Sequence, residues 1–120
     1  MAITNYRDLA VWSKAMAVAK SVYALAELMP KKEEYRLTAQ MIRAAISAPA
    51  NIAEGRTRAT RKDFAHFISI ARGSAAELET LLILAMDVDF LSSDKVEPVL
   101  ADVEEVGRML NALHAKLKVS

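Results

Sequence analysis

Apolar residues recur at intervals of three and four along most of the chain, which is the spacing of one face of an α-helix. The first predicted helix ends before Pro30, and the charged run at residues 31–34 indicates a solvated turn. One apolar stripe of this helix consists of Leu9, Trp12, Met16, Ala19, Tyr23 and Ala26, and it is widened by Val11, Ala15, Val18, Val22 and Leu25.

A second helix is predicted over about residues 34–54. Its apolar positions are Leu37, Met41, Ala44, Ala45, Ala48 and Ile52. Pro49 lies inside it, where a proline removes the hydrogen bond to the Ala45 carbonyl and clashes with it, so we expect a kink at Pro49. Gly55 follows where a left-handed cap would close the helix.

Thr60 and Asp63 predict the start of a third helix, because a threonine cap with an acidic residue three positions later is close to a capping box. The helix extends to about residue 86, and Gly73 in its middle indicates close packing. Its stripe is Phe64, Phe67, Ile68, Ala71, Ala75, Leu78, Leu82 and Ala85.

A fourth helix begins after a cap at Ser92 or Ser93, and Pro98 falls in its first turns, where proline is tolerated. Its stripe is Val96, Val99, Leu100, Val103, Val106, Leu110, Leu113 and Leu117. Four amphipathic helices with short links predict an all-α, up-down-up-down antiparallel four-helix bundle formed by residues 1–120 as one domain. An open helical array would need longer connections.

The composition and the first residues of the chain limit the chemistry and the cellular location that are expected. The chain contains no cysteine, which excludes disulfides and thiolate-bound metals and fits a cytoplasmic protein. The first eight residues do not have the basic and then apolar pattern of a signal peptide. No uncharged stretch approaches the roughly 20 residues of a membrane span, so no membrane partner is expected.

No arrangement of residues predicts catalysis, a metal or a cofactor. Di-metal bundles use Glu-x-x-His motifs, and the nearest pattern here is Asp63 to His66. His66 and His114 have no evident nucleophile partner, and Ser74 lacks the strand-turn-helix context of a nucleophile elbow. There is no glycine-rich phosphate loop, so we expect a protein without catalytic activity.

A polar stripe on the second predicted helix is more informative. It comprises Gln40, Arg43, Ser47, Asn51 and Glu54, which fall within an arc of about 80° on an otherwise apolar helix. The stripe is either a narrow solvated face or a polar seam between subunits in which Arg43 and Glu54 find partners. On the third helix, Ile70, Gly73 and Leu84 near Glu77, with Ala65, Ala76 and Ile83 on another side, add apolar surface beyond the core. We therefore expect a homo-oligomer.

Arg56, Arg58, Arg61 and Lys62 form a basic cluster between the second and third helices, offset only by Asp63. The cluster is either solubilising or a nucleic-acid-binding surface that a cyclic oligomer would multiply around a rim. Residues 77–105 hold nine acidic residues and one lysine, and in an up-down bundle the turn after the third helix lies at the opposite end. Binding would be sensitive to salt and weakly selective for sequence.

Several segments resemble one family. They include Asp8-Leu9-Ala10-Val11-Trp12, Ser47-Ala48-Pro49-Ala50-Asn51-Ile52-Ala53-Glu54-Gly55 and Ile70-Ala71-Arg72-Gly73-Ser74-Ala75-Ala76-Glu77. The chain resembles the four-helix-bundle proteins encoded in intervening sequences of bacterial 23S ribosomal RNA genes. The resemblance implies a kinked bundle that assembles as a homopentamer. The accessory protein of diversity-generating retroelements is similar in fold, and it binds nucleic acid and a reverse transcriptase.

Two hypotheses remain at this point. The chain is a non-catalytic oligomeric scaffold that binds RNA, DNA or a reverse-transcriptase-like protein acting on them, or it is a purely structural oligomer. An enzyme lacks any supporting arrangement of residues.

Overall fold

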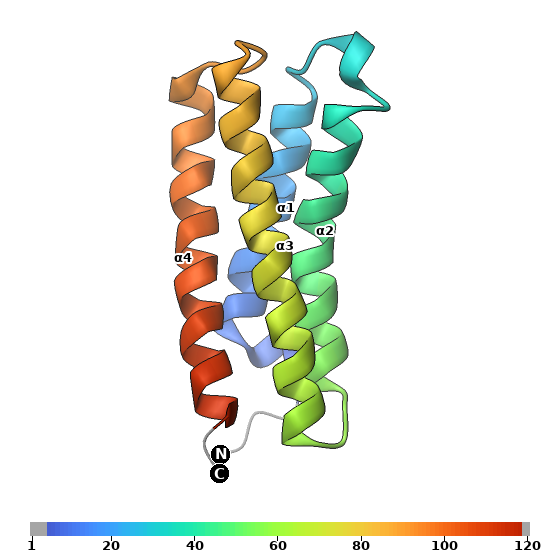
Figure 1. Cartoon of the computed structure of the whole chain (residues 1–120), viewed down its shortest axis with the longest axis vertical. Helices are drawn as coiled ribbons and strands as arrows, with labels where there is room; N and C mark the ends of the chain where they lie inside the picture. The colour runs from blue at the N-terminus through green and yellow to red at the C-terminus, as the bar shows by residue number, and fades with distance from the viewer. Residues whose placement is uncertain (1–4, 119–120) are drawn as a thin grey trace.

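The computed structural model describes residues 5–118, and four long helices dominate them (Figure 1). The elements in chain order are η1 (Tyr6–Asp8), α1 (Ala10–Ala26), η2 (Lys31–Glu33), α2 (Leu37–Arg56), α3 (Arg61–Asp87) and α4 (Ser93–Lys118). They form an elongated bundle of 47 × 23 × 20 Å. The predicted all-α four-helix fold is confirmed.

The helices run alternately up and down, each packed on its neighbours in the chain, and α4 closes the bundle against α1 (Figure 1). With this topology the α2–α3 connection, the start of α1 and the end of α4 share one end of the molecule. The α1–α2 and α3–α4 connections share the other end. This arrangement determines which charged residues lie together at each end of the bundle.

The apolar stripes of α3 and α4 form the core as predicted, with Val96, Val103 and Leu110 among the most buried side chains of α4. The inner face of α1 differs from the prediction, because most of its buried residues are those expected only to widen the stripe. The buried residues are Val11, Ala15, Val18, Ala19, Val22 and Leu25. Trp12 and Met16 are only partly buried, and Tyr23 is exposed, because this stripe borders α2 rather than the bundle axis.

The second helix begins later than predicted, at Leu37, because the preceding residues form η2 and a turn. Glu33, expected to be solvated, is 4% exposed. Its carboxylate accepts a hydrogen bond from the Leu37 backbone N–H at 3.3 Å and lies 3.5 Å from Arg36 Nε. A buried carboxylate that caps a helix start satisfies a backbone donor that would otherwise have no partner.

Gly55 does not act as a left-handed cap, so that prediction was wrong. No glycine has a positive φ, and α2 continues to Arg56 with Thr57 as its cap. Gly55 instead permits close packing, since a Cβ added there would lie 2.8 Å from Phe67 Cβ. Gly73, expected to be closely packed, has nothing within 4 Å of an added Cβ.

Pro49 is buried within α2, which is helical on both sides of it, and the kink there remains a prediction. No helix within residues 5–118 is both long and apolar enough to cross a membrane.

Candidate nucleic-acid and subunit surfaces

The basic cluster lies at the junction of α2 and α3. Arg56 is the last residue of α2, Arg58 lies in the connection, and Arg61 and Lys62 begin α3. Thr60 caps α3 as predicted, its hydroxyl oxygen accepting a hydrogen bond from the Asp63 N–H at 3.0 Å. The junction is therefore a short, defined turn that presents its charges at one end of the bundle (Figure 1).

The four basic residues are not equivalent. The Arg58 guanidinium lies 2.7 Å from the Glu54 carboxylate and 4.7 Å above the centroid of the Phe67 ring. Arg56 is half-buried, whereas Arg61 and Lys62 are exposed. Arg58 thus ties the connection to both helices, and Glu54 has a partner within its own chain.

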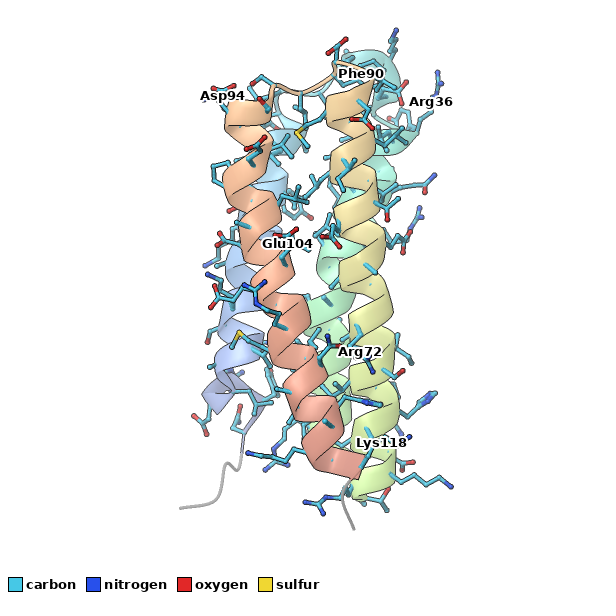
Figure 2. The ribbon with its side chains drawn as sticks, turned by 60° about the vertical axis from the view of Figure 1, so that its left-hand side comes forward. Arg36, Arg72, Phe90, Asp94, Glu104 and Lys118 are labelled. Carbon is cyan, nitrogen blue, oxygen red and sulfur yellow. The ribbon has the colours of Figure 1, made fainter. Side chains whose placement is uncertain are left out.

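The end of α4 adds basic residues that the sequence reasoning missed. Lys116 and Lys118 are exposed in the last turn of α4, beside the start of α3 (Figure 2). Burial, then the charges of Arg72 and Lys118, lower the pKa of His114 below its ordinary value. An even number of alternating helices necessarily returns the C-terminal turn to the end that holds the α2–α3 connection.

The opposite end is acidic but mixed. The α3–α4 connection and the start of α4 carry Asp87, Asp89, Asp94 and Glu97. They are accompanied by Lys31 and Lys32 of η2, and Lys32 Nζ lies 5.6 Å from the centroid of the Phe90 ring. Figure 2 shows Arg36, Phe90 and Asp94 together at this end. Because the α1–α2 connection lies at the same end, the lysines of η2 offset part of the negative charge of the α3–α4 connection.

Two members of the polar stripe on α2 are bonded within the chain, because Ser47 links α2 to α3 through Ser74 and Asn51 is bonded to Ser47 within α2. The Ser47 and Ser74 hydroxyl oxygens are 2.7 Å apart, and Asn51 Nδ2 donates to the Ser47 carbonyl at 2.9 Å and to its hydroxyl at 3.0 Å. The Ser74 hydroxyl also donates to the Ile70 carbonyl at 3.2 Å. Ser74 is buried, so this cluster is a polar patch at an interhelical contact.

The remaining members of the predicted seam are exposed. Gln40 and Arg43 on α2 and Glu77 on α3 lie on the surface, and within residues 5–118 Arg43 makes no ion pair. Apolar side chains are exposed on the same two helices, namely Ile46, Ile70, Ile83 and Leu84, and Val88 is exposed directly after α3. The structure thus places polar and apolar candidates for a subunit contact side by side, and the contact itself stays a prediction.

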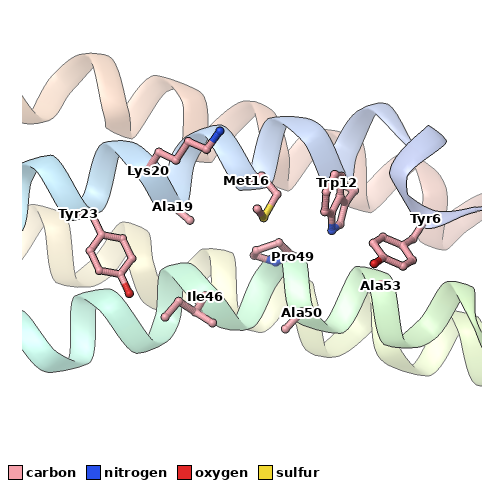
Figure 3. A pocket seen from close by; sticks show the side chains of 10 residues that line it. All are labelled: Tyr6, Trp12, Met16, Ala19, Lys20, Tyr23, Ile46, Pro49, Ala50 and Ala53. Atoms are coloured by element: carbon pink, nitrogen blue, oxygen red, sulfur yellow. The ribbon is translucent and has the colours of Figure 1, made fainter.

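A shallow apolar groove of about 400 Å³ separates α1 from α2 (Figure 3). Trp12, Met16 and Tyr23 form its α1 side, opposite Pro49 and other mostly small residues of α2. The Tyr6 and Trp12 rings meet edge to face, with centroids 5.3 Å apart. The groove exists because the proline and alanine side chains of α2 at this position are too short to fill the space between the two helices.

No group of three or more metal-binding side chains occurs among residues 5–118. His66 is exposed and packs edge to face on the Phe67 ring, at 5.3 Å between centroids.

A family model for the 23S rRNA-intervening sequence proteins matches residues 7–112. The chain belongs to this family. Among solved structures, this intervening-sequence protein is similar to a protein with unknown function from the S23 ribosomal protein family of Bacteroides thetaiotaomicron. The two share 24% identity with a TM-score of 0.81, and the match covers 91% of this chain and 99% of that one. At this identity the likeness shows the fold alone. No curated protein matches the intervening-sequence protein.

Proposed function

We propose that this intervening-sequence protein is a non-catalytic homo-oligomer that binds nucleic-acid backbones through its basic end. The observation that carries the proposal is the convergence of the α2–α3 junction and the last turn of α4 at one end of the bundle. Arg61, Lys62, Lys116 and Lys118 are all exposed there. Lysine and arginine side chains supply the sequence-independent part of nucleic-acid affinity by displacing counterions from phosphates.

Assembly strengthens this role. Exposed isoleucine and leucine side chains on α2 and α3 provide apolar surface for a contact between copies. Five copies is the number that the family resemblance implies. In a ring of parallel copies the basic ends lie side by side, so their potentials add. Light scattering tests this part, and a single species at the chain mass of 13.2 kDa would overturn it.

The basic end offers little for base recognition. Phe67 at this end is already contacted by the Arg58 guanidinium and the His66 ring, and the Tyr6 and Trp12 rings at the start of α1 pack against each other. Since stacking on exposed aromatic rings gives single-strand binders much of their affinity per base, we expect contacts chiefly to phosphates. Binding should weaken steeply with salt and differ little between sequences.

A matched pair of double variants tests the nucleic-acid role. Lys62→Ala with Lys118→Ala removes two exposed charges from the basic end, whereas Lys31→Ala with Lys95→Ala removes two from the opposite end. Fluorescence anisotropy with single-stranded RNA and duplex DNA at several salt concentrations gives the affinity and its salt dependence. Each lost phosphate contact should lower the slope of log affinity against log salt by about 1.

The basic-end variant should therefore bind more weakly with a shallower slope, and the opposite-end variant should match the wild type. Absence of binding at low salt, or equal losses in the two variants, would leave a purely structural oligomer as the better description.

A further inference from the structure

A second groove, between α3 and α4, has a volume of about 510 Å³ and a mixed lining. Gly73 and Ala76 line it from α3, and Gly107 lines it from α4. Glu79 and Glu104 flank one part of the groove, and Arg72 and Arg108 flank another. Figure 2 shows Glu104 and Arg72 along this side of the bundle, between its two ends. Small residues therefore form the floor of the groove, and charged residues form its borders.

The two glycines of the groove are not explained by packing within the chain. A Cβ added at Gly73 or Gly107 would meet nothing within 4 Å, whereas one added at Gly55 would collide with α3. A glycine inside a helix costs about 1 kcal/mol relative to alanine. Gly73 and Gly107 therefore lower the stability of their own helices, but they leave room for another backbone to approach.

Glu79 and Glu104 form the acidic border of the groove. Burial, and then the neighbouring Glu104 carboxyl, raise the pKa of Glu79. Within residues 5–118 neither glutamate forms a salt bridge with a lysine or arginine. A positive charge placed between them would relieve the repulsion of the two carboxylates.

Arg43 has the complementary properties, because it is exposed on α2 and unpaired among the described residues. Its height along the bundle follows from the Ser47–Ser74 hydrogen bond, which sets the register of α2 against α3. Arg43 is four residues from Ser47 and Glu79 is five from Ser74, in the same direction along the bundle. At 1.5 Å per residue these offsets are about 6 Å and about 7.5 Å. Arg43 and the Glu79–Glu104 pair therefore lie at nearly the same level.

We propose that the α3–α4 groove receives the exposed face of α2 from a second copy of this chain, with the partner's Arg43 between Glu79 and Glu104. Copies related by rotation about an axis parallel to the bundle have equal heights, so the charges meet without a shift along the helices. Ala50, exposed on the same face of α2, is small enough to lie over the glycine floor. The inference rests on the homo-oligomer of the proposed function.

The contact joins two different surfaces of the chain, α2 on one copy and the α3–α4 groove on the next. Since α2 packs directly beside α3, these two surfaces are not diametrically opposite. A contact of this head-to-tail kind closes a ring when the rotation between successive copies is a whole fraction of a full turn.

Charge reversal tests the contact. Arg43→Glu places a third carboxylate beside Glu79 and Glu104, and the pair Glu79→Lys with Glu104→Lys places two lysines opposite Arg43. We expect light scattering to give the single-chain mass of 13.2 kDa for each, with helical circular dichroism retained. Combining all three changes restores opposite charges, and the wild-type mass should return. Lys31→Glu, the same charge change at an exposed site of η2, should leave the mass unchanged.

A steric variant tests the floor of the groove independently. Gly73→Leu with Gly107→Leu fills open space in the isolated chain, so helicity should be kept while assembly is lost. A wild-type protein that is itself a single chain overturns the proposed oligomer and this contact together. An oligomeric wild type whose mass Arg43→Glu or the leucines do not change overturns the contact alone. Failure of the triple variant to reassemble does the same, because Arg43 then has a different partner.

Discussion

Gly55→Ala is expected to destabilise the bundle, although alanine is the better helix former. The added Cβ would lie 2.8 Å from Phe67 Cβ, 3.1 Å from Phe64 Cδ1 and 3.3 Å from the Phe64 carbonyl oxygen. The Phe64 ring can rotate, but Phe67 Cβ and the Phe64 carbonyl move only with the backbone of α3. The variant therefore forces α2 and α3 apart where the chain passes from one to the other.

The magnitude follows from a comparison with Gly107→Ala. Both changes gain about 1 kcal/mol of helix propensity, but only the change at Gly55 creates an overlap, and overpacking of this kind costs about 1–3 kcal/mol. Because the propensity gain cancels between the variants, their free energies of unfolding should differ by about 1–3 kcal/mol. In melting temperature each kcal/mol corresponds to about 2–8 °C for a domain of this size class.

Urea unfolding followed by circular dichroism, at one protein concentration for all variants, measures this difference. Light scattering on the same samples separates a change in the fold from a change in assembly, since Gly107 also lines the α3–α4 groove. Equal unfolding free energies for Gly55→Ala and Gly107→Ala would show that α3 yields freely at Phe67, and the packing argument would be refuted.

Ser74→Ala should lower the free energy of unfolding in urea by about 1 kcal/mol, because it removes the hydrogen bond to Ser47 at a buried site. If the double variant with Ser47→Ala costs the sum of the two single changes, the hydrogen bond between the two serines does not contribute to stability. Thr60→Ala should cost about 1 kcal/mol through loss of the cap on α3, while Thr60→Asn should retain most of the stability. His114 has a lowered pKa in the fold, so the unfolded chain binds its proton more readily and stability should fall as pH drops below about 6.5. His114→Gln should flatten the pH dependence of the melting temperature between pH 7 and 5, and an unchanged slope would exclude this residue as its source.

The helices could be predicted because local sequence patterns specify where they form and where they begin. The stripes of α3 and α4 and the Thr60 cap depend on residues within a few positions of one another. The inner face of α1 could not be chosen, since both of its stripes are apolar and only packing against α2 and α4 selects Val11, Ala15 and Val18.

The surfaces were predictable in part. The pairing of Arg58 with Glu54 follows the helical spacing of four and could have been anticipated from the sequence. The role of Gly55 could not, because the same residue type closes helices in other proteins and only the position of Phe67 distinguishes the two uses. The α2 polar stripe likewise divides into Ser47, which bonds α3 and is supported by Asn51, and Arg43, which is exposed to solvent. That division requires knowing where Ser74 lies.

The start of α1 and the end of α4 share the end of the bundle that holds the α2–α3 connection. Two copies can therefore be encoded as one polypeptide, since a linker from the last turn of α4 to the first turn of the next α1 stays at that end and does not run the 47 Å length of the molecule. Such concatemers would fix the number and order of copies. A variant could then be placed in one chosen copy, and its effect on a single junction measured while all others remain wild type.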